Sequence, residues 1–286
     1  MDCARSTELW NRVHGRIGVW RIDVERFAET ESSVLVFGQR DDQPVVLKVI
    51  KRPGDEWRSG GILDAFEGRG VVRVYEYVDG AMLLERLSPA RSLVTTAFCG
   101  TDDDATAVLA ETIRMMSPRT GLDGVPTAKD WGKGFERYAA SGDAQIPKPL
   151  FSAADRMYFE LCGSQTRVRL LHGDLHHSNV LFDAVRGWLA VDPKGVVGEV
   201  EYEVGAALRN PYERPELFAS PSVIRKRVED FSLELDLDPT RVLSWAFAQA
   251  VLAAVWAVED GFRIEPGNAW IALATELQRM LEGENV

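Results

Sequence analysis

Cysteine is scarce in this chain of 286 residues, which contains only Cys3, Cys99 and Cys162. Their odd number, their wide spacing and the lack of a CxxC pair disfavour both a disulfide framework and a zinc site. The opening residues, Met-Asp-Cys-Ala-Arg, also lack the basic and then apolar stretch of a secretory signal. We therefore expect a protein of the reducing cytoplasm.

Long apolar runs are also missing. The most apolar stretch, residues 245–258, is interrupted by Gln249 and is shorter than the roughly 20 residues that a membrane span requires. It predicts a buried helix, and no membrane partner is expected. A hydrophobic content of 45% over 286 residues is enough for one large domain or two lobes.

Basic residues are outnumbered, with 33 Lys and Arg against 44 Asp and Glu and a formal net charge of −11. Binding to the phosphate backbone of nucleic acid requires clustered basic side chains, so nucleic acid is not expected as a partner. An excess of acid suits cationic ligands, although such an excess more often serves solubility.

Alternating apolar and polar residues mark the first part of the chain as a sheet. After a polar helical lead-in, five antiparallel strands are expected near residues 19–27, 34–38, 44–50, 71–78 and 81–87. One helix is expected over residues 55–66. Because Ser88-Pro89 ends the run of strands, we place the boundary between an N-terminal lobe, 1–87, and a C-terminal lobe, 88–286, at this point.

The C-terminal lobe has mainly helical periodicity. Helices are expected near residues 105–116, 129–140, 152–162, 204–208, 222–234, 240–260 and 268–283. Three aspartates, 102–104, precede the first of them and are read as a helix cap rather than as a metal site.

Lys48 stands inside an otherwise apolar strand, where a lysine is rare unless it is paired. Two interpretations remain open. Lys48 is either an edge residue whose ammonium group reaches water, or a phosphate-binding lysine held by a carboxylate. Glu56 is the preferred carboxylate, and Glu67 is the alternative.

A polar loop between two apolar pairs, residues 170–181, carries Asp174 and Asn179, and Asp192 follows thirteen residues after Asn179. Residues 179–183 and 188–192 predict a hairpin that returns Asp192 to Asn179, so that their oxygens suit Mg²⁺. Phosphoryl transfer requires a cation at the phosphates, a metal and a base at the acceptor hydroxyl. Lys48, the Asn–Asp pair and Asp174 match these needs in order. Zinc is not expected, because adjacent histidines such as those at 176–177 seldom face one ion.

The segment His172-Gly173-Asp174-Leu175-His176-His177-Ser178-Asn179 resembles the catalytic loop of the aminoglycoside phosphotransferases. Residues 68–73, 82–87 and 255–261 are similar to the streptomycin/hydroxyurea kinase branch of that family, and the resemblance spans roughly residues 30–262. It implies an α+β, two-lobed protein-kinase-like fold. The N-terminal lobe would be a five-stranded antiparallel sheet plus one helix, and the C-terminal lobe mainly helical with a short β-hairpin.

The resemblance implies an enzyme that uses ATP and Mg²⁺ to phosphorylate a hydroxyl of a small cationic antibiotic, and so confers resistance. In the best-known members of the branch this is the 6-hydroxyl of the streptidine ring of streptomycin. We expect a monomer or weak dimer. Two alternatives stay open: a kinase of another small metabolite or a hydroxyurea-like compound, and a non-catalytic kinase-like module that binds nucleotide.

The family pattern makes Asp174 the catalytic base and makes Asn179 and Asp192 the Mg²⁺ ligands. The residues that it assigns to the nucleotide are Lys48 with its partner Glu56, the tip Ser32-Ser33, and the hinge Glu85 to Leu87. The tip departs from protein kinases, because no GxGxxG is present.

Six further residues receive roles from the pattern. His172 and Glu203 are expected to brace the catalytic loop. Four acids either pair with the guanidinium groups of streptomycin or belong to solvated faces, namely Glu199, Glu201, Glu259 and Asp260.

Overall fold

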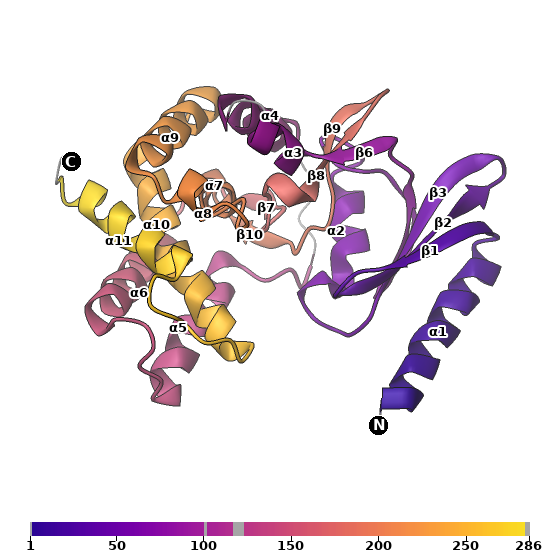
Figure 1. The fold of residues 1–286 in the computed structure, drawn as a ribbon, viewed down its shortest axis with the longest axis horizontal. Coiled ribbons are helices and arrows are strands. Elements are labelled where there is room, and N and C mark those ends of the chain that lie inside the picture. Colours follow the sequence, from indigo (N-terminus) through magenta and orange to yellow (C-terminus); the bar gives the residue numbers. More distant parts are fainter. Residues whose placement is uncertain (1, 100–101, 117–122, 284–286) are drawn as a thin grey trace.

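A computed structural model describes residues 2–99, 102–116 and 123–283. The described residues form a strand-rich N-terminal lobe and a mainly helical C-terminal lobe that lie side by side (Figure 1). This confirms the two-lobed arrangement. The exact lobe boundary near residue 88 stays a prediction.

The N-terminal lobe is built on a five-stranded antiparallel sheet. Its strands, in the spatial order β1-β2-β3-β5-β4, are β1 (Asp23–Glu29), β2 (Ser33–Arg40), β3 (Gln43–Ile50), β5 (Ala81–Glu85) and β4 (Val74–Val78). A short 3₁₀ turn, η1 (Asp55–Arg58), and helix α2 (Ser59–Ala65) follow β3. All five strands and this helical segment were expected from the sequence.

Helices cover the two faces of this sheet from opposite sides (Figure 1). Helix α1 (Asp2–Val19) lies on the outer face, where Val13 packs with Val34, Val36 and Leu47 in a small separate core. Helix α2 lies on the inner face, and its Ile62 and Leu63 belong to the main core that continues into the C-terminal lobe. The first helix was expected only as a polar lead-in, yet its apolar side seals one face of the sheet.

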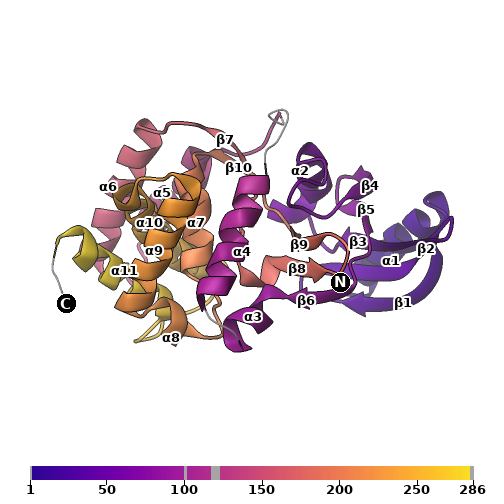
Figure 2. The ribbon, with the colours of Figure 1, turned by 90° about the horizontal axis from the view of Figure 1, so that it is seen from above.

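Two small sheets lie where the lobes meet. Strands β8 (Val180–Asp183) and β9 (Gly187–Ala190) form the expected hairpin. Strand β6 (Pro89–Ser92) extends it to the order β6-β8-β9. Strands β7 (Arg169–Leu171) and β10 (Val196–Gly198) pair antiparallel and flank the polar loop. Figure 2 shows this hairpin reaching from the helical lobe toward the large sheet.

The helices of the C-terminal lobe are α3 (Leu93–Cys99), α4 (Asp102–Met115), α5 (Ala128–Ser141), α6 (Lys148–Gly163), α7 (Val200–Leu208), α8 (Pro215–Phe218), α9 (Pro221–Leu235), α10 (Pro239–Glu259) and α11 (Ala269–Leu281). Helices α5, α6, α7, α9 and α11 pack against α10, whose buried side chains include Trp245 and Phe247. Only the short helices α3 and α8 were not expected. In the part of the chain that the structure describes, α10 alone is long and apolar enough to cross a membrane, and 72% of its most apolar window is buried inside the fold.

Local signals explain where several helices begin. Thr127 and Asp130 form a reciprocal capping box at the start of α5. The Asp238 side chain accepts hydrogen bonds from two backbone N–H groups in the first turn of α10. Asp102, expected in a cap, lies in the first turn of α4 and forms a 2.5 Å ion pair with the buried Arg227 of α9. That acid therefore also joins two helices.

Candidate active site

The loop that carries Asp174 is fixed by a fully buried histidine. The Nε2 atom of His172 lies 2.8 Å from the Val191 carbonyl oxygen, and its Nδ1 atom accepts from the Asp174 backbone N–H at 3.3 Å. Burial lowers the pKa of His172 to about 4, so the ring is neutral, with its proton on Nε2. His172 thus joins the loop to the end of the β8–β9 hairpin, as a bracing residue would.

Glu203 holds the same loop from the other side. Its carboxylate accepts the Gly173 backbone N–H at 3.0 Å, which is the type of contact that the sequence led us to expect. Burial raises the pKa of Glu203 to about 7, although hydrogen bonds from loop N–H groups oppose this shift. The carboxyl group is therefore easily protonated near neutral pH.

The hairpin brings Asn179 and Asp192 together. Val180 pairs with Ala190 across its strands, and the Val191 N–H donates to the Asn179 carbonyl at 2.9 Å. The amide nitrogen of Asn179 donates to the Asp174 carbonyl at 2.9 Å, which leaves its amide oxygen for other partners. An amide oxygen beside a carboxylate suits Mg²⁺, which keeps several waters and phosphate oxygens as further ligands. The described residues contain no cluster of three or more His, Cys, Asp or Glu able to hold a metal ion.

Lys48 is buried on the central strand β3 between two carboxylates. Its Nζ lies 2.9 Å from Glu56 and 2.7 Å from Asp192. Burial opposes its charge, but these two carboxylates outweigh burial and raise the pKa of Lys48. The edge interpretation is therefore wrong, and the partner is Glu56 rather than Glu67, which pairs with Arg69 at 3.5 Å.

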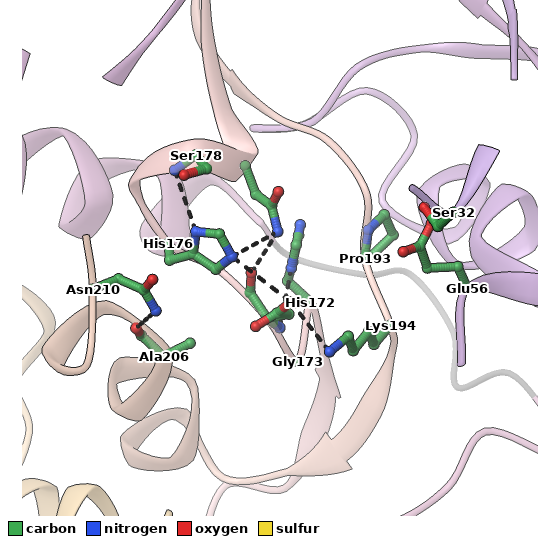
Figure 3. Close-up of polar contacts among 12 residues, drawn as sticks. Ser32, Glu56, His172, Gly173, His176, Ser178, Pro193, Lys194, Ala206 and Asn210 are labelled. Carbon is green, nitrogen blue, oxygen red and sulfur yellow. Dashed lines mark hydrogen bonds and ion pairs between the residues drawn. The ribbon is translucent and has the colours of Figure 1, made fainter. Parts of the chain in front are cut away.

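Asp174 is surrounded by basic groups. Its carboxylate lies 3.4 Å from Lys194 Nζ, 3.7 Å from His176 Nε2 and 3.8 Å from Arg209 Nη2. Figure 3 shows two of these groups, His176 and Lys194. Burial alone would raise the pKa of Asp174, but His176 and the charges of Lys194 and Arg209 outweigh it and hold the pKa well below its usual range. Asp174 is consequently a carboxylate over the whole physiological pH range.

Two cavities adjoin this group. The central cavity, ≈ 370 Å³, is lined by Asp55, Asp130, Trp131, Arg137, Gly173, Lys194, Arg209, Trp256, Glu259 and Asp260. The strand-side cavity, ≈ 600 Å³, is lined by Glu31, Ser32, Ile50, Lys51, Arg52, Gly54, Asp55, Glu56 and Lys194. Gly173, next to Asp174, therefore lies at the central cavity, and Glu56, the partner of Lys48, lies at the strand-side cavity.

Of the expected tip residues, Ser32 and Ser33, only Ser32 lines the strand-side cavity. Ser32 lines that cavity, and its hydroxyl donates to Glu56 at 3.2 Å. Ser33 is buried, and its hydroxyl lies 2.8 Å from that of Thr30 inside the turn. The assignment of the Ser33 side chain to the phosphates is therefore corrected, because the turn uses this hydroxyl internally.

The expected hinge joins the lobes. The Glu85 carboxylate accepts the Arg73 backbone N–H at 2.7 Å and pairs with Arg186 from the turn of the hairpin. Arg186 also donates to the Gly68 carbonyl at 2.5 Å. Leu87 is partly buried against the main core. The contact of this backbone with adenine stays a prediction.

Two of the four acids expected at the substrate lie elsewhere. Glu199 is fully buried, where its carboxylate accepts from Arg241 Nε at 2.5 Å, from the Thr166 N–H at 2.9 Å and from the Trp245 indole. Glu201 is also buried and lies 3.7 Å from Arg167. Neither lines the central cavity, because α7 is buried on all sides. Both are therefore structural acids.

The other two acids, Glu259 and Asp260, do line the central cavity. Glu259 forms a bidentate ion pair with Arg137, whose Nε and Nη2 donate to its carboxylate at 2.7 and 2.8 Å. Sequence reasoning missed the cavity residues of α5, Trp131 and Arg137, since no local pattern distinguishes them from core and surface. It also left Lys194 unassigned, although its place two residues after Asp192 was a signal.

Comparison with known proteins identifies the group to which this site belongs. Residues 19–261 match the aminoglycoside/hydroxyurea antibiotic resistance kinases. The chain belongs to this family. It is 34% identical over 238 residues to a streptomycin 3″-kinase of Klebsiella pneumoniae, covering 81% of this chain and 86% of that protein. It is 29% identical over 260 residues to a streptomycin 6-kinase of Streptomyces griseus, covering 85% and 81%.

Solved structures support the same fold at low sequence identity. Choline kinase LicA from Streptococcus pneumoniae matches with a TM-score of 0.61 and 13% identity over 96% of this chain and 99% of that one. A ternary complex of aminoglycoside phosphotransferase APH(4)-Ia with ADP and hygromycin B matches with a TM-score of 0.60 and 12% identity over 96% and 98%. The fold is therefore protein-kinase-like. Membership of the antibiotic resistance kinase family makes the chain a phosphotransferase with an alcohol group as acceptor.

Proposed function

We propose that this protein transfers the γ-phosphoryl group of ATP to a hydroxyl of streptomycin and thereby protects a cell against that antibiotic. The observation that carries the proposal is the position of Asp174. This ionised carboxylate touches Lys194 and Arg209, which both line the central cavity, and that cavity also carries Glu259 and Asp260. A base thus lies beside an opening with acids suited to a cationic acceptor.

The chain's own residues account for the transfer as follows. As a bond forms between the acceptor oxygen and the γ-phosphorus, the bond from that phosphorus to the β,γ-bridging oxygen breaks, and its electron pair leaves with ADP. The acceptor proton passes to Asp174. Lys48, fixed by Glu56, would contact the α- and β-phosphates. Mg²⁺ held by Asn179 and Asp192 would neutralise phosphate charge.

Recognition of the acceptor is assigned to the central cavity. Streptomycin carries two guanidinium groups, and these pair well with carboxylates and stack on indole rings. Trp131 and Trp256 line the cavity with ring centroids 5.7 Å apart at 89°. Asp260 makes no polar side-chain contact with any described residue, so its carboxylate is open to a ligand. Glu259 already holds a guanidinium, that of Arg137.

The phosphorylated position has two candidates. The family resemblance led us to expect the 6-hydroxyl of the streptidine ring, and two relatives at 29% identity bear the name streptomycin 6-kinase. The relative at 34% identity bears the name streptomycin 3″-kinase. We retain the 6-hydroxyl as the proposal and treat the 3″-hydroxyl as its competitor, because no contact of the central cavity distinguishes them.

The experiment combines purified protein with ATP, Mg²⁺ and streptomycin and measures ADP release. We expect turnover that depends on streptomycin, and tandem mass spectrometry of the product assigns the phosphate to the streptidine or the glucosamine ring. Hydroxyurea and a panel of amino alcohols serve as competing acceptors. Their phosphorylation in place of streptomycin would favour the second candidate, a kinase of another small compound, which a hydroxyurea phosphotransferase at 28% identity supports.

A further inference from the structure

Lys194 and Asp55 both line the central and the strand-side cavity, and among the described residues Lys194 is the only basic side chain that lines both. The strand-side cavity holds Ser32 and Glu56, which neighbour the phosphate-binding lysine. The central cavity holds the acids assigned to the acceptor. Figure 3 shows the Lys194 side chain extending toward the catalytic loop near His172, across from Glu56. A group that passes from nucleotide to acceptor must travel through the space that this side chain borders.

The backbone of Lys194 is held from both lobes. Its N–H donates to the His172 carbonyl at 3.1 Å, and the next N–H, from Gly195, donates to the same oxygen at 2.9 Å. From the N-terminal lobe, the Ser59 hydroxyl donates to the Pro193 carbonyl at 2.7 Å. Gly195 has φ +77°, and a Cβ there would come within 2.3 Å of Ile62. The main chain is thus fixed, and the motion left to Lys194 is that of its side chain.

The other two cations near the reacting centre are more tightly engaged. Lys48 is 3% exposed and lies between two carboxylates. Arg209 is 8% exposed and donates to the Gln249 side chain at 2.9 Å. The Lys194 side chain is 33% exposed, and the ion pair of its Nζ with Asp174 is loose at 3.4 Å. Lys194 is therefore the cation that can change its partner at the smallest cost.

We propose that Lys194 is a catalytic residue that contacts the non-bridging oxygens of the phosphoryl group during transfer, an assignment that rests on the proposed function. In the transition state, negative charge spreads over these oxygens and a positioned cation stabilises it. The ammonium group leaves Asp174 for the γ-phosphate when ATP binds, and this frees the carboxylate to accept the acceptor proton. No proton is transferred to or from Lys194.

The test replaces Lys194 by methionine, which keeps the length of the side chain and removes its charge. We expect Lys194→Met to lower turnover about 100- to 1,000-fold, as loss of one transition-state contact does. The slow hydrolysis of ATP without an acceptor should fall in parallel, because the same phosphoryl oxygens are involved. Affinity for ADP should change less than about threefold, whereas added aluminium fluoride, which mimics the phosphoryl group in transfer, should no longer tighten ADP binding.

Two further variants complete the design. Lys194→Arg keeps the charge and should restore most of the turnover, which separates a charge effect from loss of packing. Lys226→Met removes the same charge from the exposed face of α9 and should leave turnover unchanged, since Lys226 pairs with Asp230 there. Circular dichroism confirms that each variant is folded.

The outcomes separate the two proposals. If the wild-type protein turns over ATP at a negligible rate, both without an acceptor and with every acceptor tested, the proposed function is overturned and this inference with it. Wild-type turnover that Lys194→Met retains, or loses together with ADP affinity, overturns only the role of Lys194. In the second case Lys194 would hold the nucleotide in the ground state.

Discussion

At the scale of single residues, the proposed base, Asp174, has its protonation state set by its neighbours. Asp174 has Lys194, His176 and Arg209 within 3.8 Å of its carboxylate. These groups keep its pKa low, so Asp174 is a weak base in the resting site. In the proposed mechanism Asp174 becomes a stronger base when Lys194 moves to the phosphate, and the attacking hydroxyl becomes more acidic as its bond to phosphorus forms. The proposed mechanism therefore places proton transfer late in the reaction rather than before it.

Replacement of Asp174 by asparagine tests this arrangement. We expect Asp174→Asn to lower kcat about 100- to 10,000-fold, the usual contribution of a general base, and to leave the affinity for ADP unchanged. Steady-state kinetics with streptomycin and calorimetric titration with ADP measure the two effects. Asp103→Asn, on the exposed side of α4, is the matched control. A variant with the wild-type rate would remove Asp174 from the mechanism.

At the scale of elements, the β8–β9 hairpin could be predicted from the sequence, whereas the burial of the acids at the start of α7 could not. The catalytic hairpin was predictable because the Asn179–Asp192 spacing and a short turn determine its geometry locally. The acids at the start of α7 were not, because alternating charge is typical of a solvated face. Glu199 is buried by two partners, Arg241 and Trp245. They lie 42 and 46 residues further along the chain. No local pattern announces such long-range pairing.

Alanine variants of Glu199 and Glu259 test whether Glu199 is a structural acid rather than a substrate-binding one. Glu199→Ala leaves Arg241 and the Trp245 indole without their buried acceptor, so we expect the free energy of unfolding to fall by about 3–5 kcal/mol. The KM for streptomycin should stay unchanged. Glu259→Ala should do the opposite, raising KM with little effect on stability. Urea unfolding and steady-state kinetics on both variants give the comparison, and a raised KM in Glu199→Ala would restore its substrate role.

At the scale of the whole molecule, the buried Glu203 makes stability depend on pH. Its folded pKa of about 7 lies above the ordinary value of 4.5, so the native state retains a proton that the unfolded chain releases. This contribution is fully present below pH 4.5 and is lost as the pH rises to about 7, with a maximum near 3 kcal/mol. His172 acts with the opposite sign, because its folded pKa of about 4 makes stability fall as the pH drops below 6.5.

A comparison of wild type with Glu203→Gln isolates the first of these effects. The glutamine cannot ionise, so the variant should gain about 2–3 kcal/mol relative to wild type between pH 5 and pH 8, because part of the wild-type contribution is already lost at pH 5. The contribution of His172 is present in both proteins and cancels. Urea unfolding at both pH values measures the difference, with Glu265→Gln as an exposed control. Parallel pH profiles for all three proteins would show that Glu203 is ionised throughout.

The sequence predicted the elements of the two lobes better than it predicted the spatial order of the strands and the packing of α1 on the sheet. Five strands, their antiparallel order along the chain and a helical second lobe follow from periodicity and turn residues. The spatial order β1-β2-β3-β5-β4 and the addition of β6 to the hairpin depend on long-range pairing. The apolar side of α1 was hidden because its buried positions are interrupted by charged residues.

Helix α1 has a practical consequence for anyone who trims this protein. The region shared with the family starts at residue 19, after nearly all of this helix. Yet Leu9, Val13 and Ile17 cover the outer face of the large sheet, and Arg12 donates to the Ile50 and Gly80 carbonyls at 2.9 and 3.0 Å. A fragment that starts at the family boundary would expose the apolar outer face of the sheet and would tend to aggregate. Its insolubility would then reflect the missing helix and not the stability of the intact enzyme.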